Sequence, residues 1–164
     1  GPGERYLGPF SDWLQAHRTE VLELLAVRGA LDELAVSQAA KQADDETVES
    51  IARAHEAFEA AAAEADHDLD ALAELDIAFH MAIARASGSV LLEHLLEELN
   101  QLFTEARKAV YGIDRRPVGS AREHGEILAA VRAREPVAAR DATARHVAAT
   151  CALLTGTTAT DGAS

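Results

Sequence analysis

The sequence predicts an all-α protein of six to seven helices. Alanine, leucine and glutamate dominate the 164 residues, and runs of β-branched residues are short, a composition that favours helix. No proline occurs between Pro9 and Pro117, so the residue that most strongly breaks helices is absent from this long interval. A chain of this length suits one domain with a single core.

The first helices are predicted from capping residues and apolar periodicity. Residues 1–9 hold three glycines and two prolines and are predicted to be a linker or a tag remnant, which would make the chain an excised fragment. A short helix is expected over 11–18 and a long one from Thr19 to Ala43. The long helix should turn one apolar stripe inward, with Arg28 beside it. The residues of this stripe are Leu24, Val27, Leu31, Leu34 and Gln38.

The middle of the chain contains further helix starts. The aspartate pair at 44–45 is predicted to cap a helix over 46–65. After the polar break ADHDLD, the next helix ends at Ser87-Gly88, a typical C-terminal signal. Ser89 can then cap a helix over 90–111. The residues that this helix is expected to bury are Leu92, Leu95, Leu96, Leu99 and Phe103.

The last third of the chain carries two more predicted helices. Residues 112–120 contain a proline and a glycine and form the longest predicted loop. A helix is expected over 120–134, and Pro136 suits the first turn of the final helix, over 136–154. The tail over 156–164 is predicted to be disordered.

Charge and hydropathy exclude several functions for this chain alone. The formal net charge is −13, so the acidic surface is unsuited to nucleic acid or to an anionic membrane. No apolar run approaches the length of a membrane span. We expect a soluble, cytoplasmic protein without membrane contact. The single cysteine, Cys151, is expected to be a small packed residue rather than a nucleophile.

One predicted helix places a carboxylate and an imidazole on its inward face. Asp76 and His80 are four residues apart, and Leu72, Phe79 and Ile83 share their stripe. Buried polar groups need partners. Two such residues on one helix can supply two ligands to a single metal ion.

Two more histidines are predicted to face inward from other helices. His124 shares its stripe with Ile127 and Val131, and His146 shares its stripe with Ala142. Three imidazoles and a carboxylate suit Zn, Ni, Fe, Mn or Co, and open positions could take water or the carboxylate of a small organic acid. A lone inward histidine is more often a satisfied core residue, so a metal-free scaffold stays an open alternative. The remaining histidines are expected at the surface, at His17, His55, His67 and His94.

Four motifs follow one another in an order that resembles a known family. They are VLELLAVRGALDELA, LDIAFHMAIARASGS, REHGEILAAVRAREPVAAR and ARHVAA. Over nearly all of 14–154, this succession resembles the effector-binding domain of GntR-family transcription regulators, of the FadR C-terminal domain type. The family's glutamate before the first-helix arginine is absent here, where Ala26 and Val27 precede Arg28.

The resemblance implies an antiparallel helical bundle in which 10–155 form the effector-binding domain. Arg28 would either face the effector cavity and pair with a carboxylate of the effector, or form a surface or interhelix salt bridge. Arg107 is a second candidate for binding the effector. The resemblance also implies a divalent metal ion, Zn, Ni, Mn or Fe. Its ligands would be Asp76, His80, His124 and His146.

A ligand-sensing role follows from the same resemblance. We expect a homodimer in which a small organic acid modulates the binding of operator DNA by an N-terminal winged helix-turn-helix domain outside this chain. No enzyme activity is expected. The alternative is a metal-dependent helical-bundle enzyme that acts on a small carboxylate, for which Glu123 is the one candidate general acid or base.

Overall fold

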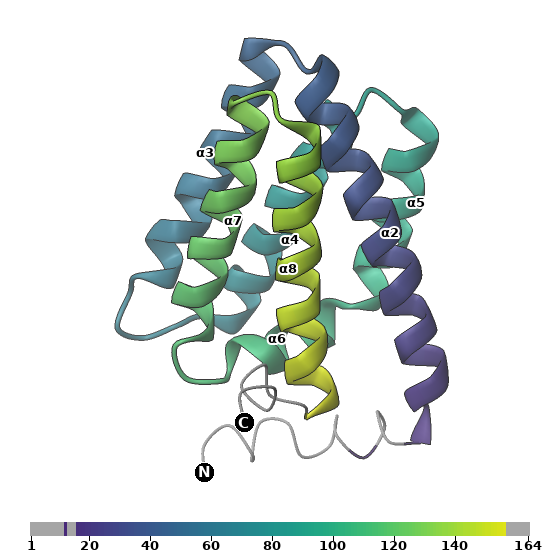
Figure 1. Cartoon of the computed structure of the whole chain (residues 1–164). Helices are drawn as coiled ribbons and strands as arrows, with labels where there is room; N and C mark the ends of the chain where they lie inside the picture. Colours follow the sequence, from purple (N-terminus) through teal and green to yellow (C-terminus); the bar gives the residue numbers. More distant parts are fainter. Residues whose placement is uncertain (1–11, 13–15, 157–164) are drawn as a thin grey trace, which may run out of the picture.

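The structure is a computed structural model that describes residue 12 and residues 16–156. Within these residues the chain forms seven α-helices and no strand, which confirms the predicted all-α class (Figure 1). The helices are α2 (Arg18–Gln42), α3 (Asp45–Ala62), α4 (Leu69–Ala86), α5 (Val90–Leu102), α6 (Thr104–Tyr111), α7 (Arg116–Arg132) and α8 (Pro136–Thr155). The predicted linker over 1–9, half of the helix predicted over 11–18 and the tail over 157–164 lie outside the described residues.

Five of the helices form a closed ring. α4 packs against α3, α3 against α7, α7 against α8, α8 against α2, and α2 against α4 again. α5 lies beside α2 and α4 outside this ring, and the short α6 crosses one end, where it contacts α4, α7 and α8 (Figure 1). Side chains that point into the ring from α2, α4, α7 and α8 can therefore meet.

Side-chain caps begin three helices at or near the predicted positions. Asp44 accepts a hydrogen bond from a backbone amide in the first turn of α3 at 2.8 Å, and Ser89 does the same for α5 at 3.2 Å. Asp68, in the polar break, caps α4. Gly88 has a left-handed φ of 77° and follows the end of α4, as predicted. Each cap satisfies a backbone donor that the first turn leaves unpaired.

Two hydrophobic clusters fill the inside of the molecule. One contains Ile51 and Phe79, and the other contains Phe58, Leu72 and Tyr111. Complete burial of a large apolar side chain contributes about 1.5–3 kcal/mol of stability. The candidate site lies where the clusters meet, because Phe79 and Phe58 both contact the same buried histidine.

The buried face of α2 differs from the predicted stripe. Val27 and Leu34 are 53% and 46% exposed. The buried face instead carries Gly29 together with Arg28 and Asp32. A Cβ atom at Gly29 would meet a side chain of α8 at 3.1 Å. The prediction was wrong for Val27 and Leu34, whereas Leu24, Leu31 and Gln38 are partly buried. The close approach of α8 at Gly29 explains why a residue without a side chain lies on the buried face.

The single helix predicted over 90–111 is broken at Phe103. This residue has φ −101° and ψ 10° and separates α5 from α6. No proline or glycine lies at the break. Arg107 supports it from α6, because its guanidinium donates a hydrogen bond to the main-chain oxygen of Asn100 on α5 at 3.1 Å.

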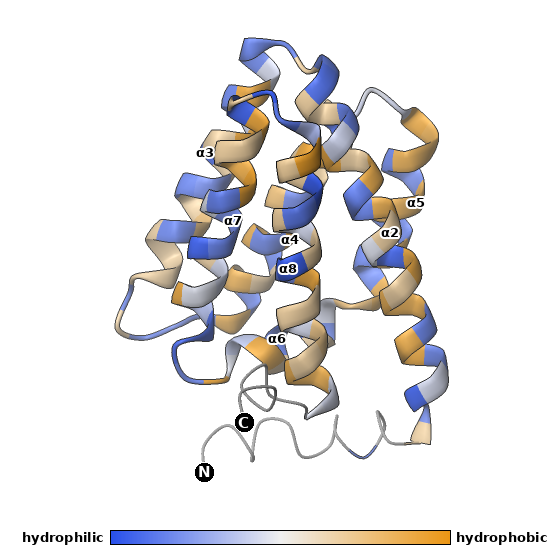
Figure 2. Cartoon of the chain, in the orientation of Figure 1, coloured by the Kyte–Doolittle hydropathy of each residue, from blue (hydrophilic) through white to orange (hydrophobic). Residues whose placement is uncertain are grey.

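α5 buries less apolar surface than predicted. Leu92 and Leu96 are buried, but Leu99 is only partly buried, and Leu95 and Leu91 are 44% and 70% exposed. Figure 2 shows hydrophobic residues along the outside of α5. The cause is the position of α5 outside the ring, because the ring covers only the face of α5 that packs against α2 and α4. None of the described helices combines the length and hydrophobicity needed to cross a membrane.

α7 begins at Arg116, inside the predicted loop. Arg115 adopts the left-handed conformation with φ 63°, and Pro117 occupies the first turn, where its missing N–H is tolerated. Ser120 does not cap the helix but is buried within it. The earlier start matters for the site because it places Arg116 and Glu123 on one helix.

Candidate metal centre

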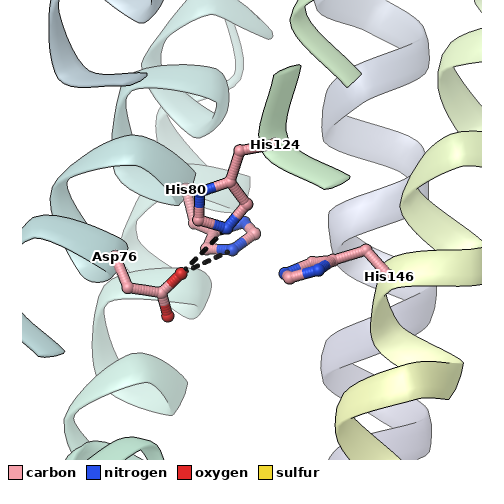
Figure 3. A group of neighbouring side chains, drawn as sticks. All are labelled: Asp76, His80, His124 and His146. Carbon is pink, nitrogen blue, oxygen red and sulfur yellow. Dashed lines mark ion pairs between the residues drawn. The ribbon is translucent and has the colours of Figure 1, made fainter. Parts of the chain in front are cut away.

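Four buried side chains from three helices converge inside the ring (Figure 3). Asp76 and His80 come from α4, His124 from α7 and His146 from α8. Each offers one potential ligand atom, and these atoms all lie within 4.8 Å of one another. The structure therefore brings together the four residues that the sequence predicts as metal ligands.

Several atoms inside this cluster have no hydrogen-bond partner. Nε2 of His124 lies 3.0 Å from Oδ1 of Asp76, and Nε2 of His80 lies 3.3 Å from the same oxygen. The geometry of neither contact is that of a hydrogen bond. Nε2 of His124, Nε2 of His80 and Oδ1 of Asp76 therefore have no hydrogen-bond partner. A buried unpaired polar group costs about 1–3 kcal/mol. A divalent cation among these atoms would bind their lone pairs, so the residues present fit a metal ion.

His80 and His124 are neutral at pH 7, as metal binding requires. Burial lowers the pKa of His80 to about 3 and the pKa of His124 to about 4, and the neighbouring Asp76 offsets this only in part. Burial alone would raise the pKa of Asp76, but His80 and Arg107 outweigh burial and hold that pKa well below its usual range. The cluster thus offers an ionised carboxylate beside neutral rings.

Aromatic packing holds His124 in place. Its ring stacks on Phe79 with centroids 4.2 Å apart and 15° between the planes, and Phe58 lies 4.8 Å from it. Phe79 also contacts the ring of His80 edge-on, at 5.3 Å. We call Phe58, Phe79, His80 and His124 the aromatic side of the site. Ring contacts rather than hydrogen bonds fix this side.

His55 extends the aromatic packing, although the sequence predicts it at the surface. It is only 8% exposed, and its ring lies 6.1 Å from that of Phe79. Gly125 on α7 leaves room for it, since a Cβ atom there would stand 3.5 Å from Nε2 of His55. The prediction was wrong because the close approach of two helices at a glycine is not visible in periodicity.

Hydrogen bonds hold His146 in place. Its Nδ1 lies 2.6 Å from Oε1 of Glu123, and Arg116 donates two bonds of 2.8 Å to the same carboxylate. We call Arg116, Glu123 and His146 the polar side of the site. Burial alone would raise the pKa of Glu123, but hydrogen bonds from His146 and Arg116 lower it to about 2. Sequence reasoning missed Arg116 because it assigned this residue to a loop; the helix-start preference of Pro117 could have found it.

A narrow cavity lies beside the cluster, between α2, α6 and α8. Its volume of about 20 Å³ holds one or two water molecules. A larger molecule can enter only if side chains move. The lining includes Arg28, Phe103, Arg107, Tyr111 and His146.

Both arginines predicted to bind the effector line this cavity, and both face a carboxylate. Arg107 donates from Nε to Oδ2 of Asp76 and from Nη2 to Oδ1 of Asn100, each at 2.6 Å. Nε of Arg28 lies 3.3 Å from Asp32 without forming a hydrogen bond. Burial, followed by the charge of Arg107, lowers the pKa of Arg28, and burial raises the pKa of Asp32. Asp32 is a site residue that the sequence did not indicate.

Comparison with known proteins identifies a matching family and solved structures with a similar fold. The sequence model of the FCD domain matches residues 23–149. The solved structure of E. coli McbR/YncC is similar with a TM-score of 0.74 and 18% identity, over 84% of this chain and 65% of that one. Streptococcus agalactiae GntR is similar with a TM-score of 0.65 and 24% identity, over 82% and 57%. The chain thus spans less than two thirds of either protein, and at these identities the likeness shows the fold alone.

Proposed function

The chain belongs to the FCD domain family, the effector-binding domains of GntR-family transcription regulators, and from this premise we propose that it binds a divalent metal ion and a small organic acid. Binding of the acid would regulate a separate DNA-binding domain. The observation that carries the proposal is a buried group of four potential ligands, in which atoms of Asp76, His80 and His124 have no hydrogen-bond partner.

The metal would be held by Asp76 and the three histidines of the cluster. When bound, Zn, Ni, Mn or Fe supplies a Lewis acid that attracts oxygen ligands. A single carboxylate neutralises only half of a divalent charge, so a second anion is favoured as a further ligand. A small organic acid provides such a carboxylate.

Arg28 and Arg107 would bind the acid from the cavity beside the cluster. Arg107 already donates to Asp76, so an incoming carboxylate would compete for its guanidinium. The cavity has room for water alone, and therefore the acid must displace side chains. α6 carries both Arg107 and Tyr111, and its displacement is the proposed signal.

GntR-family regulators bind small-molecule effectors and DNA and often dimerise. For this chain, we place the effector-binding domain at residues 10–155 of a cytoplasmic homodimer. DNA would be bound by an N-terminal winged helix-turn-helix domain outside the given sequence. The net charge of −13 supports this division, since an acidic surface repels phosphates.

The alternative is a metal-dependent enzyme that acts on a small carboxylate. Such an enzyme needs an available general acid or base beside the metal. Glu123 is the candidate, but it is already bound to Arg116 and His146 through three hydrogen bonds. We therefore favour the regulatory function.

Thermal unfolding after chelation, with Zn, Ni or Mn added back, tests the proposal. Metal at about a hundredfold over its dissociation constant should add about 2.7 kcal/mol, and the midpoint should rise by about 5 to 10 °C in a domain of this size. His124→Ala should abolish the rise, and His94→Ala, at an exposed position on α5, should keep it. The absence of a rise in the parent chain would refute the metal site. Small carboxylic acids are then screened on the metal-loaded chain.

A further inference from the structure

The polar side of the site contains a carboxylate that contacts one proposed ligand from outside the cluster. We infer that Glu123, held by Arg116, is a positioning residue that directs Nε2 of His146 toward the metal. This inference rests on the proposed function, because it concerns how one of the proposed ligands is presented. It assigns roles to two residues, Glu123 and Arg116, that lie outside the ligand set.

The hydrogen bond between His146 and Glu123 determines which ring nitrogen is free. Nδ1 of His146 lies 2.6 Å from Oε1 of Glu123, and the two residues are 3% and 9% exposed. An ionised carboxylate only accepts hydrogen bonds, so Nδ1 carries the hydrogen. In a neutral imidazole the other nitrogen, Nε2, then has the lone pair that a metal ion binds.

Arg116 fixes the carboxylate that makes this bond. Its Nη1 and Nη2 donate to Oε2 and Oε1 of Glu123, each at 2.8 Å. This two-pronged geometry sets the plane of the carboxylate as well as its position. Nη2 also reaches Oγ1 of Thr150, one turn beyond His146 on α8, at 3.4 Å. The network therefore joins the start of α7 to the helix that carries the ligand.

His146 needs this support because it lacks the packing that encloses His124. Among the described residues, the aromatic rings paired with that of His146 are two imidazoles, those of His80 at 5.3 Å and His124 at 4.8 Å, and no phenylalanine ring is paired with it. His146 also lines the cavity between α2, α6 and α8. Without Glu123 the ring could rotate and exchange its hydrogen between the two nitrogens.

The first test measures the tautomer of His146 in the metal-free chain by long-range ¹H–¹⁵N NMR spectra. We expect the hydrogen on Nδ1 in the parent chain. Glu123→Met keeps the length of the side chain but removes the acceptor, so the Nε2–H tautomer should appear. Glu126→Met is the matched control, because Glu126 lies on the same helix with its side chain 45% exposed. Nε2–H in the parent chain would overturn the inference, and this result needs no variant.

The second test measures Zn²⁺ affinity by competition with a chromophoric chelator. Glu123→Met should weaken binding by about 10- to 100-fold, and Glu126→Met should leave it unchanged. Arg116→Lys keeps the charge but loses the two-pronged geometry, so it should weaken binding to a smaller extent. This variant serves if Glu123→Met does not fold.

The outcomes separate this inference from the function on which it rests. Absence of Zn²⁺ binding by the parent chain would refute both. Binding of Zn²⁺ by the parent chain with the same affinity in Glu123→Met and Arg116→Lys would leave the proposed function standing and overturn the inference. A tautomer change together with weaker binding supports it, because a residue that only stabilised the fold would not change the tautomer.

Discussion

His124 and His146 lie on neighbouring helices and face the same cluster, but they are held in different ways. Two phenylalanine rings contact His124, and neither of its ring nitrogens has a hydrogen-bond partner. His146 is held by a carboxylate that a guanidinium fixes in turn. Aromatic contact restricts where a ring lies, whereas a hydrogen bond also selects the nitrogen that carries the hydrogen.

Loss of the aromatic contacts and loss of the hydrogen bonds should have different effects on stability and on metal affinity. The aromatic side belongs to the hydrophobic core, so its loss removes stability whether or not metal is bound. The polar side orients one ligand through hydrogen bonds, so its loss chiefly changes metal affinity. Substitutions on the two sides can test this difference.

The largest effect is expected from Phe79→Ala. Phe79 is completely buried and belongs to the hydrophobic cluster that includes Ile51. Its truncation should lower the free energy of unfolding of the metal-free chain by about 3–5 kcal/mol in urea denaturation. Leu102→Ala, at a position 65% exposed, should change it by less than about 0.5 kcal/mol. A similar small loss for Phe79→Ala would contradict the idea that aromatic packing supports the site.

The next largest effect is expected from loss of the ion pair between Arg107 and Asp76, the carboxylate that also contacts the histidines. Arg107→Gln removes the partner of Oδ2 and should destabilise the metal-free chain by about 3 kcal/mol, because a buried charge loses its counter-ion. Zn²⁺ would replace part of that interaction. It should therefore raise the unfolding midpoint of Arg107→Gln by more than that of the parent chain.

Arg85→Gln is the control for this substitution, since the side chain of Arg85 is 62% exposed. It should leave both the metal-free stability and the response to Zn²⁺ unchanged. Equal midpoint rises in Arg107→Gln and the parent chain would show that the ion pair with Asp76 does not influence the metal site.

Apolar periodicity in the sequence predicts both the helices and the inward position of the four proposed ligands. Asp76, His80, His124 and His146 lie on helices whose apolar stripes are long enough to identify the inward face. Periodicity cannot show that separate helices bring these faces together. The family's order of motifs supplied that step, and the structure agrees with it.

Other features left weak or misleading signals. The inward face of α2 carries Arg28 and Asp32, so the predicted apolar stripe lies beside the buried face and two of its residues, Val27 and Leu34, are exposed. The pair formed by Arg116 and Glu123 depends on a helix that begins four residues before the predicted cap at Ser120. The break at Phe103 depends on tertiary contacts and has no proline or glycine to indicate it.

The smallest of the three effects is the response of the metal-free chain to acid. His80 and His124 have pKa values of about 3 and about 4 in the folded chain, against about 6.5 when unfolded. Between these values the unfolded chain binds more protons, so the free energy of unfolding falls as pH decreases. From pH 7 to 5.5 each histidine should remove about 1.2 kcal/mol. Asp76 and Glu123 titrate below this window because their pKa values are lowered.

Substitution of one ring tests whether this loss comes from the aromatic side. In urea denaturation of the metal-free chain at several pH values, His124→Gln should lose about half of the change between pH 7 and 5.5. His94→Ala, at an exposed position, should keep all of it. A free energy of unfolding that stays constant over this range in the parent chain would mean that water reaches both rings. The contrast between an enclosed His124 and a hydrogen-bonded His146 would then be wrong.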